Sequence, residues 1–198
     1  IPLRLVGSEM CIRDSYQSWQ RAAAPLAERS QLELVHSESY LDMVFDVTGD
    51  ADEPAPLDAD TWASKRGYEC ASRAAGGACL AVDMVMENKA STAFSLMRPP
   101  GHHAEPEQAM GFCLFSSAAI AARHAQQKWG LNRIAVIDFD VHHGNGTQAC
   151  FWNDGSLFYA SSHQMPLFPG TGAHDETGAY QNIFNLPLAY GTGGSSIR

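Results

Sequence analysis

Lysine is scarce in this sequence, which has three lysines among 13 basic residues, against 22 acidic residues. The formal net charge is −9 at pH 7. Proteins that bind nucleic acid directly neutralise its phosphates with clustered lysine and arginine, so this balance disfavours a nucleic-acid partner. Long apolar runs are also missing. No stretch has the length of a membrane span, and no secretory signal is visible. We therefore expect no membrane partner.

Paired cysteines are missing as well. The five cysteines are odd in number and form no C-x-x-C motif. This pattern excludes a disulfide framework and a cysteine-based zinc site, and it favours reduced, mostly buried thiols in the cytoplasm. The sequence also lacks a Walker loop, G-x-G-x-x-G, H-E-x-x-H, G-x-S-x-G and any internal repeat. The common signatures of nucleotide-binding proteins, zinc proteases and serine hydrolases are thereby excluded.

The remaining composition is that of one globular domain. A chain of 198 residues with 45% hydrophobic and 18% charged residues can bury a sizeable core. The chain begins at Ile1 rather than at a methionine, and residues 6–15 resemble translated adapter sequence. We therefore expect residues 1–15 to be a non-native leader and the chain to be a fragment. The sequence gives no prediction for the oligomeric state.

Apolar runs that alternate with helical stretches predict an α/β fold. Residues 134–137 form an almost unbroken apolar run, which is typical of a strand buried on both faces of a parallel sheet. The succession of strand, helix and strand favours a right-handed parallel βαβ unit. The expected strands cover 93–97, 134–137, 157–161 and 182–186, and the expected long helices cover 62–88 and 110–129.

Local signals complete this prediction. Asp60 or Thr61 is expected to cap the first long helix, whose Gly76-Gly77 pair would pack closely on the sheet. Gly130 is expected to end the second long helix. Weaker patterns predict a helix over 16–28, a strand over 32–36, a short helix that starts at a structural His36, an acidic surface loop over 46–60 and a short helix over 147–152.

Polar side chains crowd the end of the expected central strand. In an extended chain Asp138, Asp140 and His142 would share one face, where ligands of α/β sheets gather. Carboxylate oxygen and imidazole nitrogen suit a borderline metal such as zinc, although an isolated Asp-x-His fits a simple hydrogen bond equally well. A second cluster, His102-His103, follows another apolar segment and a Pro-Pro pair. Two His-His pairs at strand ends favour one shared metal-dependent site.

Four motifs together resemble, in order and spacing, those of the zinc-dependent histone deacetylase superfamily. They are residues 98–104, 111–115, 138–147 and 168–172. The R-P-P-G-H-H form is most similar to the class II branch, which also holds bacterial acetylpolyamine amidohydrolases. The resemblance implies an arginase–deacetylase-like three-layer sandwich with a mainly parallel sheet. It also implies that residues 16–198 are the N-terminal and central part of one such domain, truncated at the C-terminus.

The resemblance assigns a metal site and a pair of catalytic histidines. Asp140 and His142 match two of three zinc ligands. His102 and His103 match the active-site histidine pair, with His103 as general base, and Asp138 matches the acid that orients His102. An arginase-like second metal would need a carboxylate two positions after His142, where this chain has glycine. One catalytic zinc ion is therefore expected.

Further positions match substrate-binding and supporting residues of the family. Asn145 stands where the partner of His103 is expected. Gly111, Phe112 and Phe168 match the walls of the tunnel around an acyl-lysine stem, although ordinary core aromatics would leave the same pattern. Asp58 matches a rim aspartate that holds the substrate backbone. A structural potassium site is implied for Asp138, Asp140, His142, Ser161 and Ser162.

The implied activity is hydrolysis of acetyl or other acyl groups on acetyl-lysine of histones or other proteins. An acetylpolyamine substrate and a non-catalytic acyl-lysine binding module are the alternatives. In the family the third zinc ligand, an aspartate, and a catalytic tyrosine or histidine follow later in the chain, beyond Arg198. We therefore expect residues 1–198 alone to be inactive.

Overall fold

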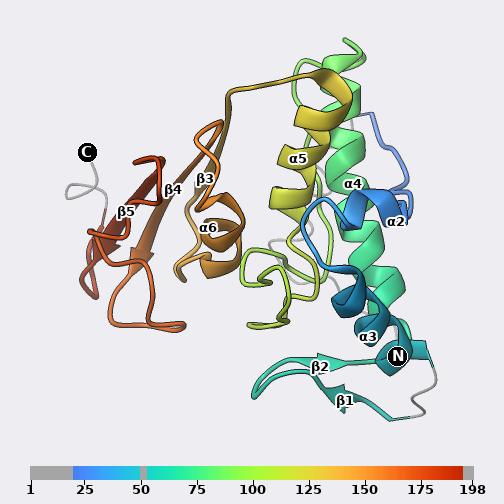
Figure 1. The fold of residues 1–198 in the computed structure, drawn as a ribbon, viewed down its shortest axis with the longest axis horizontal. Coiled ribbons are helices and arrows are strands. Elements are labelled where there is room, and N and C mark those ends of the chain that lie inside the picture. The colour runs from blue at the N-terminus through green and yellow to red at the C-terminus, as the bar shows by residue number, and fades with distance from the viewer. Residues whose placement is uncertain (1–19, 50–52, 194–198) are drawn as a thin grey trace.

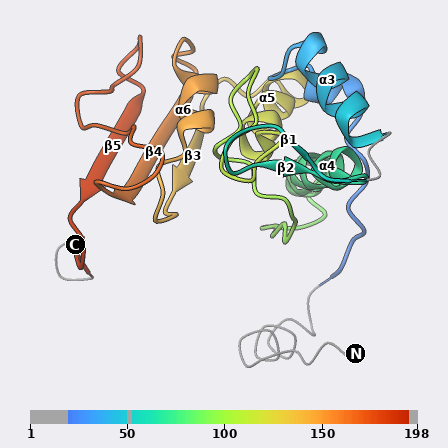
Figure 2. The same ribbon diagram turned by 90° about the horizontal axis from the view of Figure 1, so that it is seen from below.

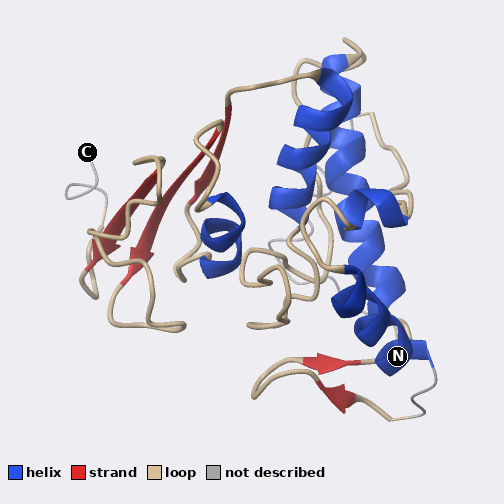
Figure 3. Ribbon diagram, viewed as in Figure 1, coloured by secondary structure: helices blue, strands red, loops and turns tan. Residues whose placement is uncertain are grey.

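The computed structural model describes residues 20–49 and 53–193 as five helices, a short hairpin and a three-stranded sheet (Figure 1). The sheet lies on one side of the molecule and the longer helices lie on the other (Figure 3). The elements are α2 Arg29–Leu32, α3 Glu38–Gly49, β1 Ala55–Pro56, β2 Trp62–Ala63, α4 Gly67–Met86, α5 Ser117–Trp129, β3 Ile134–Asp138, α6 Asn145–Phe151, β4 Leu157–Gln164 and β5 Ile183–Leu188.

The three sheet strands run parallel in the order β3-β4-β5. Helix α6 connects β3 to β4, which makes the βαβ unit of an α/β fold. The register places Asp138 opposite Ser161, and Ser161 opposite Asn185. The carboxyl ends of β3 and β4 therefore bring polar side chains together at one edge, as expected for a ligand site in such a sheet.

The prediction that residues 134–137 are buried on both faces is wrong. Ile137 is 62% exposed, and Phe158 and Phe184 on the neighbouring strands are also exposed. The opposite face carries Leu157 and Tyr159, which pack in a core cluster with Phe151 of α6. Among the described residues, β3 is an edge strand. An apolar run reports what a strand can bury, but not whether a second layer covers it.

The expected strand over 93–97 is also wrong, since these residues are irregular. The first long helix begins at Gly67 rather than at residue 62, because Trp62 and Ala63 pair with β1 in an antiparallel hairpin. Asp60 and Thr61 therefore do not cap it, and Arg66 takes the N-cap position. The acidic segment 46–60 is not one loop, because α3 extends to Gly49 and β1 follows; residues 50–52 lie outside the described residues.

The two glycines of α4 permit close packing, but not against the sheet. A Cβ on Gly76 would collide with the backbone of Pro25, and a Cβ on Gly77 would lie 3.2 Å from the Cβ of Ala24. The neighbours are therefore two irregular segments, the one before α2 and residues 93–97, because Ser95 Oγ would also lie 3.2 Å from a Cβ on Gly77. The expected helix over 16–28 is absent from residues 20–28, and its first part lies outside the described residues.

Other boundaries differ by part of an element. The expected strand over 32–36 is instead the end of α2 and a turn. Helix α5 begins at Ser117 rather than at residue 110, and it ends at Gly130 as predicted, with a left-handed φ of 66°. The short helices that begin near residues 38 and 145 are confirmed.

Helices α4 and α5 pack side by side, with α3 next to them (Figure 2) and α2 in contact with α5 (Figure 1). Buried residues such as Leu41, Cys79, Phe115 and Ile120 form the larger core cluster there. Of the four described cysteines, all are unpaired, two are buried and Cys70 is exposed. None of the helices in the described ranges is long and apolar enough to cross a membrane.

Candidate functional site

The chain that leaves β3 is bent rather than extended. One carboxylate oxygen of Asp138 accepts the backbone N–H of Asp140 at 3.1 Å. Asp140 Oδ1 in turn accepts the backbone N–H of His142 at 2.9 Å. These successive turns, in which an Asp side chain binds the backbone two residues on, curl the segment at the sheet edge. The acids after the strand thus shape the backbone as well as supplying polar groups.

Asp138 contacts His102. The distance from His102 Nδ1 to Asp138 Oδ2 is 2.9 Å, and the Tyr159 hydroxyl donates to the same oxygen at 3.0 Å. Burial tends to raise the pKa of Asp138, but the hydrogen bond from His102 and its other donors outweigh it, so the pKa lies below its ordinary value. An ionised Asp138 accepts from Nδ1 and therefore holds one tautomer of His102.

His103 contacts an amide instead of an acid. Its Nδ1 lies 2.9 Å from Asn145 Oδ1, while Asn145 Nδ2 donates to Glu105 at 2.8 Å. The amide oxygen must therefore accept from His103, so the proton sits on Nδ1 and Nε2 is free to accept. Burial lowers the pKa of His103, and the neighbouring His102 lowers it further. The ring is thus neutral at neutral pH.

Four predicted site residues lie in ring contact with one another. The ring centroids of His102 and His103 are 4.0 Å apart, and those of His103 and His142 are 5.9 Å apart. Phe168 stands edge-on to His103 at 5.1 Å and lies 6.3 Å from His142. Residues far apart in sequence therefore form one cluster with an aromatic wall.

The distance between Asp140 and His142 can be compared with that between two ligands of one zinc ion. Asp140 Oδ1 lies 3.1 Å from His142 Nδ1, and both side chains are partly exposed. Two ligands about 2.1 Å from a tetrahedral zinc ion would lie about 3.4 Å apart, which is close to this spacing. Within residues 20–49 and 53–193, no three His, Cys, Asp or Glu side chains converge as a metal site. The assignment of Asp140 and His142 as two of the three protein ligands usual for catalytic zinc stays a prediction.

The loop that carries Phe168 is fixed by buried polar groups. Glu176 accepts the backbone N–H groups of Gly172 and Ala173, as well as the amide of Gln148. His143 Nδ1 lies 2.8 Å from the Thr171 hydroxyl. This network begins one residue after His142, so it joins the loop to the segment with the expected metal ligands.

Gly111 also lies against the His103 ring, and Phe112 follows it. Gly111 has a left-handed φ of 55°, and a Cβ there would collide with the His103 ring. Phe112 is 64% exposed, so it is not a core aromatic. Asp58 lies in the β1–β2 hairpin, where its backbone N–H donates to Thr61. Its contact with a substrate stays a prediction.

The expected potassium ligands lie on adjacent strands. Ser161 is buried opposite Asp138, and its hydroxyl contacts His163 Nδ1 at 2.9 Å. Ser162 follows it and is half-buried. The potassium site and the catalytic roles assigned above stay predictions.

Sequence reasoning does not identify three supporting side chains, Tyr159, Glu105 and Thr61. Tyr159 is fully buried on β4, donates to Asp138 and accepts the Gly144 N–H at 3.1 Å. A hydroxyl on the inward side of an apolar strand is the signal that could have found it. The hydrogen bonds of Glu105 and Thr61 depend on loop conformation and leave no such pattern.

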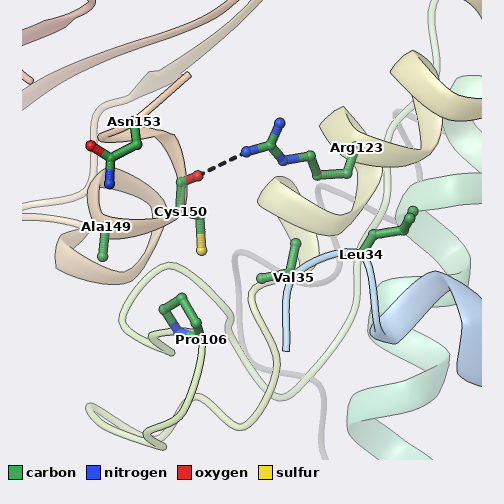
Figure 4. A pocket seen from close by; sticks show the side chains of 7 residues that line it. All are labelled: Leu34, Val35, Pro106, Arg123, Ala149, Cys150 and Asn153. Atoms are coloured by element: carbon green, nitrogen blue, oxygen red, sulfur yellow. Dashed lines mark hydrogen bonds between the residues drawn. The ribbon is translucent and has the colours of Figure 1, made fainter. Parts of the chain in front are cut away.

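A separate cavity of about 180 Å³ lies between the end of α2, α5 and α6 (Figure 4). Val35, Pro106 and Cys150 line it, and Arg123 donates to the Cys150 carbonyl across it at 3.2 Å. None of the predicted site residues lines this cavity.

Comparisons with known proteins agree on one family. The family model described as the histone deacetylase domain matches residues 4–198. Histone deacetylase 10, chloroplastic, of Oryza sativa subsp. japonica is 39% identical over 184 residues, which cover 87% of this chain and 42% of that protein. The polyamine deacetylase HDAC10 of Danio rerio is 38% identical over 170 residues, which cover 83% and 25% of the two chains.

A solved structure agrees as well. The crystal structure of the HDA15 HD domain matches with a TM-score of 0.80 at 35% identity, covering 87% of this chain and 49% of that one. This match confirms the expected α/β deacetylase fold with its parallel sheet. The chain spans less than half the length of each of these three proteins. With the family model matched over nearly all its residues, the chain belongs to the histone deacetylase family.

Proposed function

We propose that the protein is a zinc-dependent amidohydrolase that removes acetyl or similar acyl groups from acetyl-lysine in histones or other proteins. One observation carries this proposal. The buried, neutral ring of His103 is held by Asn145 beside the partly exposed Asp140–His142 pair. A proton acceptor next to zinc-type ligands is the arrangement that metal-assisted amide hydrolysis needs.

Asp140 and His142 would hold the metal ion together with a third ligand. When bound, zinc supplies a Lewis acid that polarises the amide carbonyl and acidifies water. His103 Nε2 can then accept a proton from the attacking water and return it to the leaving amine, because the other ring proton stays on Nδ1, where it is donated to Asn145 Oδ1. His102 is kept in one tautomer by Asp138 and would orient the water.

Phe112 and Phe168 suit a substrate with a long methylene stem. Both are partly exposed; Phe168 packs on His103, and Phe112 follows Gly111, which lies against the same ring. An apolar slot of this kind would accept either acetyl-lysine or an acetylated polyamine. The polyamine alternative is favoured by the similarity to the Danio rerio protein, whose name states that substrate.

The test uses the full-length native protein loaded with zinc, assayed in parallel on an acetyl-lysine peptide and an acetylated polyamine. We expect turnover of the peptide. Replacement of His103 by alanine should lower kcat by about 10²–10⁴-fold while metal content stays at the wild-type level. Asp140→Asn should instead lower the zinc content itself, measured by elemental analysis.

His174→Ala is the matched control, because His174 is exposed on the loop after Phe168 and makes none of the site's ring contacts. It should keep both activity and zinc. A preference for the acetylated polyamine would identify it, rather than acetyl-lysine, as the substrate of the proposed hydrolase. A zinc-loaded protein inactive on both substrates would overturn the hydrolase and favour an acyl-lysine binding module.

A further inference from the structure

The segment between the two motif histidines and α5 contains a strained turn. Met110 and Cys113 exchange backbone hydrogen bonds of 3.2 and 2.8 Å, which closes a two-residue turn. Both central residues have positive φ, 55° at Gly111 and 66° at Phe112. This is the type I′ pattern, whose central positions favour glycine and asparagine. Phe112 holds it despite its side chain, so other groups must fix it there.

One such group is the side chain of Thr61. The Phe112 N–H takes no part in closing the turn, and it donates to Thr61 Oγ1 at 3.0 Å. The Thr61 hydroxyl donates in turn to Asp60 Oδ1 at 3.0 Å. Thr61 is fully buried although it lies in the small β1–β2 hairpin. A buried hydroxyl with both of its roles used is a fixed anchor.

The anchor holds a turn that packs against the proposed general base. Gly111 lies so close to the His103 ring that a Cβ would collide with it. A shift of the turn would therefore change the space beside His103 and the position of the exposed Phe112 ring. The Phe168 ring also packs on His103, with centroids 5.1 Å apart.

We propose that Thr61 is a positioning residue of this site, which holds Phe112 in its left-handed conformation and thereby sets the tunnel wall next to His103. The proposal rests on the proposed deacetylase function. It makes the β1–β2 hairpin part of the substrate entrance. The Thr61 carbonyl accepts the backbone N–H groups of Leu57 and Asp58, which closes the hairpin loop, and the Thr61 hydroxyl accepts the N–H of Phe112.

A merely structural role can be separated from this one. The hairpin is closed by main-chain bonds, including Leu57 N–H to Thr61 O at 2.8 Å and the pairing of Ala55 with Ala63. A change in the Thr61 side chain leaves these bonds in place. Loss of the hydroxyl should therefore act on the turn and on substrate binding rather than on the fold.

The experiment compares Thr61→Val, which keeps shape and loses the hydroxyl, with Thr61→Ser, which keeps the hydroxyl. In the full-length, zinc-loaded protein we expect Thr61→Val to raise KM for the acetyl-lysine peptide by about 3–10-fold, the range for one lost hydrogen bond, with kcat changed less. Thr61→Ser should stay within about twofold of wild type in both constants. Zinc content should be unchanged in both variants.

A double-mutant cycle with Phe112→Gly completes the test. Glycine adopts positive φ without help, so Thr61→Val should have no added effect on kcat/KM in that background. Equal constants for wild type and Thr61→Val would overturn the positioning role while leaving the deacetylase intact. A full Thr61→Val effect in the Phe112→Gly background would also overturn it. Absence of wild-type turnover would overturn the proposed function first, and the positioning role with it.

Discussion

The two histidines at the centre of the site differ in the group that each ring contacts. His102 meets the carboxylate of Asp138, whereas His103 meets the amide oxygen of Asn145. An amide fixes the tautomer of a ring without adding a charge beside it, and burial keeps His103 neutral. The two rings, whose centroids are 4.0 Å apart, therefore have the different environments that the proposed orienting and proton-accepting roles need.

His36 should make folding stability depend on pH. Its Nε2 accepts the Ser116 N–H at 3.0 Å, its Nδ1 contacts Pro106 O, and burial lowers its pKa to about 4. Above the ordinary value of 6.5 the ring is neutral whether folded or unfolded, so no pH dependence arises. Between pH 6.5 and 4 only the unfolded chain takes up the proton, so stability should fall, in total by about 3 kcal/mol.

Urea unfolding measured between pH 7.5 and 4.5 checks this prediction. His36→Gln can keep both hydrogen bonds but has no titrating group, so its stability should fall less over the same range. The comparison cancels the titration of all other groups. Parallel pH profiles for the two proteins would assign the acid sensitivity to some other residue.

For single residues, the sequence predicts which residues belong to the site better than it predicts which groups they contact. Asp138 with His102 and Asn145 with His103 were expected pairs, and each pair lies within hydrogen-bond distance. These expectations came from the family resemblance of the motifs, which assigns a partner to each position. Thr61 and Glu105 could not be placed, because their contacts depend on how a hairpin and a loop fold against distant residues.

Among the elements, helices α4 and α5 are joined by one carboxylate. Asp83 Oδ1 accepts from His124 at 2.8 Å and from Trp129 at 2.9 Å, and Oδ2 accepts from Lys128 at 2.8 Å. Burial would raise the pKa of Asp83, but these donors outweigh it and hold the pKa at about 2. We expect Asp83→Ala to lower the free energy of unfolding by about 2–3 kcal/mol, since it leaves partly buried donors unpaired.

The matched control is Lys128→Met, which removes only the exposed partner and should lower the free energy of unfolding much less than Asp83→Ala does. Urea unfolding at pH 7 measures both. Equal losses for the two variants would show that the exposed ion pair, and not the bonds to His124 and Trp129, carries the connection.

Element types were easier to predict than element limits. Gly130 ends α5 as expected, because a left-handed C-cap is a local property of glycine. The start of α4 was misplaced, because the pairing of Trp62 with Pro56 is a contact between segments that local caps do not report. The same limit applies to residues 93–97, which have strand composition but no described neighbour strand.

At the scale of the whole molecule, none of the described residues covers the outer face of the sheet. Ile137, Phe158 and Phe184 lie exposed on adjacent strands, and Phe139 beyond β3 is 88% exposed. A contiguous apolar face of this kind favours association or aggregation. The matched region covers only 42% and 49% of two similar proteins, which are longer than this chain and have further residues that could cover such a face.

The last prediction follows from both the open face and the incomplete metal site: residues 1–198 alone should bind zinc weakly and show no deacetylase activity. The described residues offer two ligand atoms for zinc, and loss of even a supporting contact costs about 10–100-fold in metal affinity. The family resemblance places a further ligand and an oxyanion donor later in the chain, and such a donor is worth about 10²–10³ in rate.

The test measures zinc affinity, light scattering and turnover for residues 1–198 and for the full-length native protein. We expect tight binding and activity only in the longer protein, and more scattering from the shorter one. Similar affinity and turnover in both would mean that residues 1–198 contain a complete site, with its third ligand among the residues outside the described ranges.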